Sequence, residues 1–193
     1  PSKAKALILR NNGIKTRYYA LDKEGKPTHT NAEITAKAVE GLFDENFTKN
    51  DMQLLSCGTT SADQIQPSHA SMVHGVLKPN QSIEINTSMG LCNSGMNALN
   101  YAFLSVKAGA VNNAVATGSE RFSIWMTADK FNHEVENLKL LEEKPIVAFK
   151  REFLRWMLSD GSGAFLLENK PRENQLNLRI EFIDFYSYAH EIE

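Results

Sequence analysis

Residues 87–109, TSMGLCNSGMNALNYAFLSVKAG, place Cys92 at the start of a long apolar run with helical spacing. A thiol at a helix N-terminus lies near the positive end of the helix dipole and near unpaired backbone N–H groups, which favour a thiolate. The same N–H groups could hold an oxyanion. Gly95 permits close backbone approach, and the small Ser94 leaves room for a substrate. The pattern fits a nucleophile, but it also fits a small apolar residue packed between a sheet and a helix.

Composition limits the functions open to this thiol. The 193 residues carry a formal net charge of -2 and no arginine-rich stripe, which gives no electrostatic case for a nucleic-acid partner. No apolar run approaches the roughly 20 residues that cross a bilayer, and the first residues lack the apolar core of a secretory signal. Cys57 and Cys92 are too few for a disulfide framework or a zinc cluster, although they could pair with each other. We therefore expect a soluble protein in a reducing, cytoplasmic setting.

The segments that must position Cys92 alternate between short β-rich runs and longer helical runs. Thr30 and Glu33 have the spacing of a capping box, which predicts a helix. The helix behind Cys92 is apolar nearly all round, and this predicts burial at the centre of the protein. In the capped helix, Ile34, Ala38 and Leu42 are predicted to fall on one helical face.

A second helix is predicted at 67–77, because Pro67 would fall in its first turn, where the missing N–H costs nothing. In the last predicted strand, Leu176 and Leu178 begin an alternation that continues through Ile180 and Phe182, so one face should be packed and the other wet. Strands separated by helices indicate an α/β layered sheet. The predicted strands are residues 52–57, 83–86, 112–119, 163–168 and 176–189.

Four motifs in order around Cys92 resemble thiolase-fold condensing enzymes, and most closely the β-ketoacyl-acyl-carrier-protein synthase III group. LRNNGIKTRYYA resembles that group's Arg-Thr-Gly-Ile segment, and CGTTSADQIQPSHA resembles its Thr-Thr loop followed by Pro-Ser. SDGSGA resembles its Gly-Asp-Gly-Ala-Gly-Ala turn, and the fourth motif is the strand, cysteine and apolar helix around Cys92. The resemblance covers nearly the whole chain. It implies a thiolase-like layered α/β fold, with a mixed sheet and a central buried helix, as the N-terminal half of a duplicated fold.

The resemblance implies an acyltransferase. Cys92 would attack a thioester and hold the acyl group covalently, with its own backbone N–H in the oxyanion hole. Decarboxylation of a malonyl-type extender on acyl carrier protein would then give a carbanion for a Claisen condensation, as in fatty-acid or polyketide-like biosynthesis. Acyl-coenzyme A and acyl-carrier-protein thioesters would be the substrates, with no metal or redox cofactor. A homodimer is expected, in which two such halves join their sheets across strands.

Two further residues are candidates for substrate binding. Gln66 falls where related enzymes place a residue that reaches into the partner subunit's acyl pocket, although it equally fits a polar loop residue without a titrating group. Arg10 could contact the pantetheine or nucleotide of a coenzyme A donor, or only solubilise its helix. Asp160 is interpreted as a turn residue, because Asp-Gly pairs favour turns.

The family's catalytic histidine lies in the second half of the duplicated fold. The five histidines here match none of its positions and are interpreted as exposed or half-buried structural residues: His29, His69, His74, His133 and His190. Residues 1–193 are therefore interpreted as an N-terminal half whose C-terminal half is absent, unable to complete the condensation alone. Residues 128–153 are interpreted as a solvated, charge-rich insertion rather than a second domain.

Two alternatives remain open. Residues 92–96, Cys-Asn-Ser-Gly-Met, are closer to a degradative thiolase, whereas Gly118-Ser119-Glu120 replaces the Gly-Gly-Met-Glu of thiolases and SDGSGA is a synthase feature. A non-catalytic partner subunit with the same fold would use this half for dimer contacts or carrier-protein docking, but such partners usually lose the nucleophile. Acylation of Cys92 by a thioester would separate a catalytic from a non-catalytic role.

Overall fold

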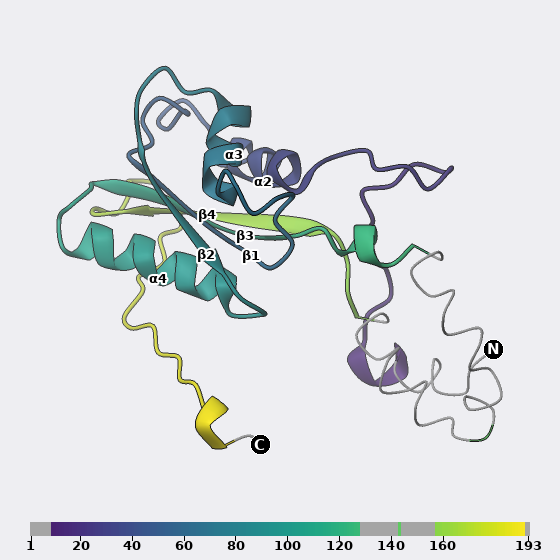
Figure 1. Ribbon diagram of the computed structural model, residues 1–193. Helices are drawn as coiled ribbons and strands as arrows, with labels where there is room; N and C mark the ends of the chain where they lie inside the picture. Colours follow the sequence, from purple (N-terminus) through teal and green to yellow (C-terminus); the bar gives the residue numbers. More distant parts are fainter. Residues whose placement is uncertain (1–8, 128–142, 144–156, 192–193) are drawn as a thin grey trace.

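The computed structural model describes residues 9–127, 143 and 157–191, arranged as a sheet between helices (Figure 1). The strand order is β2-β1-β3-β4; β1 runs parallel to β2 and β3, and β4 runs antiparallel to β3. This is the mixed α/β sheet predicted from the sequence. The strands are β1 (Leu54–Thr59), β2 (Glu84–Met89), β3 (Asn113–Glu120) and β4 (Gly161–Glu168), and the helices are α2 (Asn31–Glu40), α3 (His69–Leu77), α4 (Ser94–Lys107), η1 (Phe122–Trp125) and η3 (Ala189–Glu191).

Helices cover both faces of the sheet. Helices α2 and α3 lie on one face and α4 lies on the other (Figure 1). Side chains of β1 point alternately into the two cores: Leu55 and Cys57 pack with the α2 and α3 layer, whereas Leu54 packs with Ala102 of α4. The period-2 alternation of a strand therefore supplies both cores from one element.

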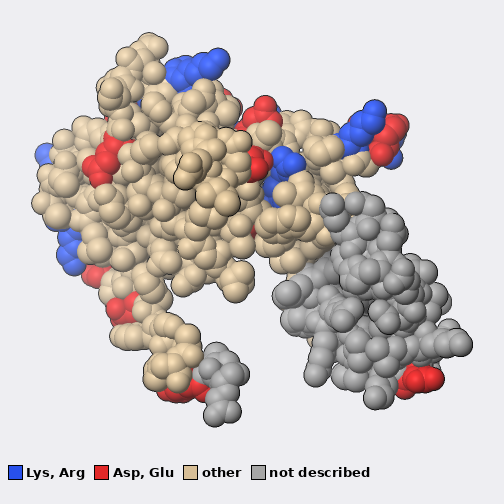
Figure 2. Space-filling view, in the orientation of Figure 1, with Lys and Arg blue, Asp and Glu red and all other residues tan. Residues whose placement is uncertain are grey.

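Surface charge is dispersed on the face seen in Figure 2. Acidic and basic side chains occur singly or in small groups there, and an uncharged expanse separates them. Within the described ranges, no helix is both long and apolar enough to cross a membrane. The predicted insertion at 128–153 lies outside the described residues, apart from Glu143.

The capping box of α2 is confirmed, and the most buried face of the helix differs from the apolar face marked in the sequence. The Thr30 side chain accepts from the Glu33 N–H, and Glu33 Oε2 accepts from the Thr30 N–H at 2.8 Å. The predicted residues at 34, 38 and 42 are only partly buried. Most of the buried side chains are small, whereas the larger Ile34 and Leu42 remain partly exposed, and Leu42 packs against the edge of this core. The buried residues of α2 are Asn31, Ala32, Thr35, Ala36 and Val39.

Helix α3 begins at His69, later than the predicted Pro67. Ser68 is its N-cap, with a side chain that accepts from the Ser71 N–H, and Pro67 lies outside the helix after a cis peptide bond from Gln66. Strand β1 also differs, running over 54–59 rather than 52–57. Its ladder with β2 continues to the pair Thr59 and Met89, because both strands extend side by side to that point.

The strand predicted at 176–189 is wrong. No strand forms there in the described chain, and Leu176 and Leu178 are 90% and 86% exposed. Ile180 alone of the alternating set packs against the α4 core. The segment leaves the sheet and runs past α4 (the yellow trace in Figure 1). Alternation provides a strand face, but a strand also needs a neighbouring edge for its backbone hydrogen bonds, and this segment has none among the described residues.

Helix α4 is central to its face of the sheet, and only its inner side is buried. Ser94, Ala98 and Ala102 face the strands and are buried, whereas Met96 and Leu104 remain 45% and 52% exposed. The prediction of burial all round therefore does not hold for the described chain by itself. The physical reason is that the described residues supply a packing layer only on the sheet side of α4.

Candidate active site

Glycines on β1 and β3 allow the start of α4 to lie close to the sheet. A Cβ on Gly58 of β1 would lie 2.2 Å from the Ser94 carbonyl oxygen, closer than any real contact. A Cβ on Gly95 would lie 3.3 Å from the Cα of Gly118 on β3. The first turn of α4 therefore rests directly on the backbones of β1 and β3, and the close approach predicted at Gly95 is confirmed.

Cys92 lies in the turn that joins β2 to α4, one residue before the N-cap Asn93, and its thiol is exposed. The Ser94 N–H donates to the Leu91 carbonyl at 3.0 Å, which closes the turn around Cys92. Asn93 makes no side-chain hydrogen bond to the helix, so its side chain does not occupy the N–H groups of the first turn. The described residues do not bury Cys92, as the alternative of a packed core cysteine would require.

Cys57 is the opposite kind of thiol. It is fully buried in β1, and burial raises its pKa to about 12, with the Thr117 hydroxyl acting weakly in the other direction. A thiol with this pKa stays protonated at neutral pH and is inert as a nucleophile. Both cysteines are free, so the possible Cys57–Cys92 disulfide is not formed.

A carboxylate at the end of β3 holds the loop that follows β1. Glu120 Oε1 accepts from the Thr60 N–H at 2.8 Å, and Glu120 Oε2 accepts from the Ser61 N–H at 3.0 Å and from the Ser61 hydroxyl at 2.5 Å. The Thr60 hydroxyl donates to the Gly90 carbonyl, at the start of the turn that carries Cys92. The Thr-Thr-Ser loop is thus bonded to two other segments.

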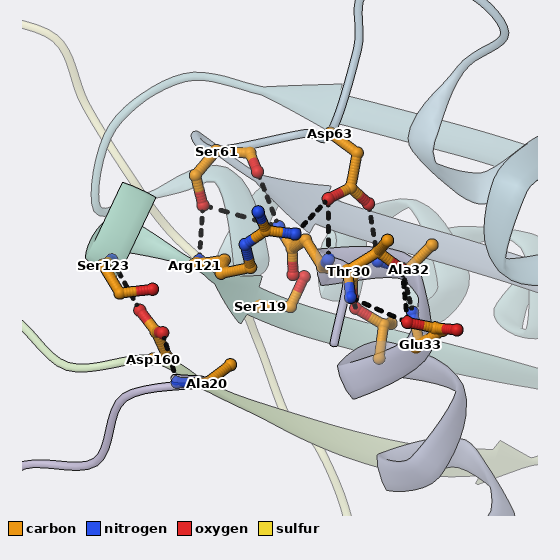
Figure 3. A network of polar contacts seen from close by, with 12 residues as sticks. Ala20, Thr30, Ala32, Glu33, Ser61, Asp63, Ser119, Arg121, Ser123 and Asp160 are labelled. Atoms are coloured by element: carbon orange, nitrogen blue, oxygen red, sulfur yellow. Dashed lines mark hydrogen bonds and ion pairs between the residues drawn. The ribbon is translucent and has the colours of Figure 1, made fainter. Parts of the chain in front are cut away.

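Asp63 anchors the same loop to α2, as Figure 3 shows. Its carboxylate accepts from the N–H groups of Asn31 and Ala32 at 2.8 and 2.9 Å and pairs with Arg121 at 3.1 Å. A carboxylate at a helix N-terminus is stabilised by the helix dipole. Sequence reasoning missed this role of Asp63, since the partners lie about 30 to 60 residues away along the chain and no local spacing marks them.

His69 is buried among hydroxyls, contrary to the prediction that the histidines are exposed or half-buried. Its Nε2 lies 3.2 Å from Thr35 Oγ1 and 3.1 Å from Ser119 Oγ, and its Nδ1 has no partner among the described residues. Burial lowers the pKa of His69, while the carboxylates of Asp63 and Glu120 oppose that shift. The neutral imidazole therefore joins α2, α3 and β3.

The structure separates the two predicted binding residues. Gln66 is exposed in the loop after β1, and Cys92 follows β2, so both lie at the carboxyl edge of the parallel strands. Arg10 is exposed in a helical segment at 9–12, drawn in purple, which Figure 1 shows away from the turn between β2 and α4. The structure does not bring Arg10 to Cys92.

Asp160 does more than serve a turn. Its carboxylate accepts from the Ala20 N–H at 2.7 Å and from the Ser123 N–H at 2.9 Å (Figure 3). It therefore joins the N-terminal segment to η1 and to the start of β4, a tertiary role that turn preference did not predict.

Known proteins resemble this chain in sequence and in fold. No family model matches the chain. Among curated proteins, β-ketoacyl-[acyl-carrier-protein] synthase III of Actinobacillus succinogenes is 26% identical over 176 residues, which cover 91% of this chain and 48% of that protein. The synthase III of Rhizorhabdus wittichii is 30% identical over 117 residues, 60% of this chain and 35% of that protein. The chain thus spans about half of the first relative and a smaller part of the second.

Solved structures give the fold. AbyA1, a tetronic acid condensing enzyme, matches with a TM-score of 0.62 and 19% identity over 85% of this chain and 43% of its own. The synthase III of Thermus thermophilus matches with a TM-score of 0.54 and 21% identity, over 84% of this chain and 42% of its own. OleA of Xanthomonas campestris, bound with cerulenin, matches with a TM-score of 0.57 and 20% identity, over 86% of this chain and 49% of its own. The chain has the thiolase-type fold.

The thiolase-type fold confirms the predicted fold class and the resemblance to condensing enzymes. In sequence the chain is similar to the N-terminal part of synthase III proteins, in agreement with the four motifs. Strand β4, which begins at Gly161, the Thr-Thr loop and the Cys92 turn all lie within the described residues. The roles of Cys92, Gln66 and Arg10 remain predictions.

Proposed function

We propose that this chain is the acyl-accepting half of an acyltransferase that forms carbon–carbon bonds. Cys92 would be the residue that holds the acyl group as a thioester. The observation that carries the proposal is the exposed thiol in a closed turn at the start of α4, whose first residues rest on the strands at Gly58 and Gly118. Similarity to synthase III proteins supports the same chemistry.

The first step would transfer an acyl group to Cys92. The Cys92 thiol gives up its proton and the thiolate attacks the carbonyl carbon of a thioester. A new C–S bond forms, the bond from that carbon to the donor sulfur breaks, and the donor thiolate leaves and takes up a proton. The carbonyl oxygen becomes an oxyanion in between. The backbone N–H of Cys92 and the N–H groups at the positive end of α4 would stabilise that charge.

The second step would form the carbon–carbon bond. A malonyl-type thioester on acyl carrier protein loses CO2, and the resulting carbanion attacks the acyl carbon on Cys92. The bond between carbon and Cys92 sulfur breaks, which returns the thiolate and leaves a β-ketoacyl thioester on the carrier. We assign no described residue to the decarboxylation itself.

Substrate contacts are also proposals. Gln66 lies at the same strand edge as Cys92, which supports contact with the acyl chain. Arg10 is exposed and could meet a coenzyme A donor only at the distal end of that donor, because its segment is away from the Cys92 turn (Figure 1). The two free thiols support a reducing, cytoplasmic setting.

Assembly as a homodimer is supported by an open edge. Strand β2 is an edge of the sheet in the described chain, and its Ile85 and Met89 are exposed. An exposed edge presents unpaired backbone groups that can bond to another strand. We propose that two copies pair along β2, next to the turns that carry Cys92.

The test is intact-protein mass spectrometry of the full-length protein after incubation with acyl-coenzyme A and with acyl-carrier-protein thioesters. We expect a mass gain of one acyl group that maps to Cys92, is lost in Cys92→Ala and is kept in the matched Cys57→Ala variant. A folded protein that gains no mass with any thioester would contradict the proposal and favour a non-catalytic partner subunit.

A further inference from the structure

Two neighbouring strand ends are linked beyond the last pair of the sheet. Strands β1 and β2 end together at Thr59 and Met89. One residue further on, the Thr60 hydroxyl donates to the Gly90 carbonyl. This side-chain bond extends the alignment of the two strands into the turn before Cys92.

Thr60 is itself held from the other side. Its backbone N–H donates to Glu120 Oε1, and the next N–H, of Ser61, donates to Glu120 Oε2. The Ser61 hydroxyl accepts from the Arg121 N–H at 2.6 Å. Thr60 and Ser61 are therefore both hydrogen-bonded to residues at the end of β3. A carboxylate that accepts several N–H and O–H bonds restrains its donors more strongly than a neutral acceptor does.

The two backbone carbonyls that precede Cys92 are both hydrogen-bonded. Gly90 C=O accepts from Thr60, and Leu91 C=O accepts from the Ser94 N–H. The Asn93 side chain also lies back over Gly90, since a Cβ on Gly90 would be 3.4 Å from Asn93 Oδ1. The peptide planes before the thiol are therefore set by one long-range bond and one local bond.

We propose that Thr60 is a positioning residue for Cys92 and that Glu120 is its anchor. This inference rests on the proposed function, because it matters for acyl transfer only if Cys92 is the nucleophile. The Thr60 hydroxyl fixes the orientation of the Gly90–Leu91 peptide, and the thiol is thereby held at the start of α4. Displacement of a reacting group by about 1 Å can cost on the order of 100-fold in rate.

The test compares Thr60→Val, which keeps the shape and the backbone N–H but loses the hydroxyl, with Thr60→Ser, which keeps the hydroxyl. In the full-length protein we expect Thr60→Val to lower the rate of Cys92 acylation by about 10- to 100-fold. Thr60→Ser should stay within about threefold of the parent rate. Equal loss in both variants, or no loss in Thr60→Val, would overturn the proposal.

Amide hydrogen exchange provides a readout that does not depend on activity. Thr60→Val should speed exchange within residues 90–96 and leave α2 unchanged, and Thr60→Ser should exchange like the parent. If the parent protein is not acylated by any thioester, the proposed function fails, and the exchange comparison alone decides the positioning role. If Thr60→Val does not fold, Glu120→Gln replaces it in the test. The Gln side-chain NH2 group would then face the N–H donor of Thr60 or Ser61, where the carboxylate accepts in the parent. Acylation of Glu120→Gln at the parent rate would overturn the anchor role.

Discussion

Iodoacetamide should alkylate Cys92 and leave Cys57 unmodified in the folded protein. The Cys92 thiol is exposed, whereas Cys57 is fully buried with a pKa raised to about 12. Thiolate and access are both needed for reaction, and Cys57 lacks both. Peptide mass spectrometry after a short pulse at pH 7.5 measures this, with a guanidinium-unfolded sample in which both cysteines react. Equal labelling of the two cysteines in the native protein would contradict the assigned burial.

His69 should make stability dependent on pH on the acid side. Its pKa is lowered in the folded state by burial, which outweighs the opposing carboxylates of Asp63 and Glu120. Below the ordinary histidine pKa of about 6.5 the unfolded chain binds more protons than the folded protein. The contribution of His69 to stability is therefore complete above that pH and declines as the pH falls below it.

Urea denaturation between pH 5 and 8 measures the effect of His69. His69→Gln should be less stable at all pH values, because hydrogen bonds to Thr35 and Ser119 are lost or weakened, but its stability should fall less toward pH 5. The exposed His190 provides the control, and His190→Gln should keep the parent slope. An unchanged slope in His69→Gln would remove His69 as the cause.

At the scale of elements, the contact between α4 and the sheet requires a glycine at position 58. In Gly58→Ala the added Cβ would lie 2.2 Å from the Ser94 carbonyl oxygen, so the helix start must move. Overpacking of this kind costs about 1–3 kcal/mol, and the same shift should slow acylation of Cys92.

Gly163→Ala on β4 is the matched control, because its Cβ would meet nothing within 4 Å. We expect a change within about 0.5 kcal/mol in that variant, as for ordinary surface substitutions. Urea denaturation of both variants, followed by the acylation assay, measures the difference. Similar stability of Gly58→Ala and Gly163→Ala would show that α4 does not depend on this close contact.

At the scale of the whole molecule, the two edge strands of the sheet, β2 and β4, are the places where a second copy could pair, and we expect pairing along β2. Ile85→Lys places a charge beside the open edge of β2 and should raise the dimer dissociation constant at least about tenfold, since edge lysines oppose strand pairing. Phe165→Lys, on the other edge strand β4, should leave the dimer intact. Sedimentation velocity over a concentration series measures both, and loss of the dimer in Phe165→Lys alone would move the interface to β4.

The sequence by itself determined the features that depend on near neighbours along the chain. Alternation and helical spacing predicted the α/β layering, the strands around 112–119 and 163–168, and the helix after Cys92, and Thr30 with Glu33 predicted a helix start. These signals arise from residues within about four positions of one another, where the geometry of the helix or strand alone determines which side chains are neighbours.

Only the tertiary structure decided the contacts that hold the candidate site. Glu120 meets Thr60, Asp63 meets the start of α2, and Gly58 meets Ser94, each across about 30 to 60 residues of sequence. The segment 176–189 shows the same limit from the other direction, because its alternation lacked a neighbouring edge to bond. Strand pairing and helix seating are properties of two partners, and no pattern within one segment specifies where its partner lies.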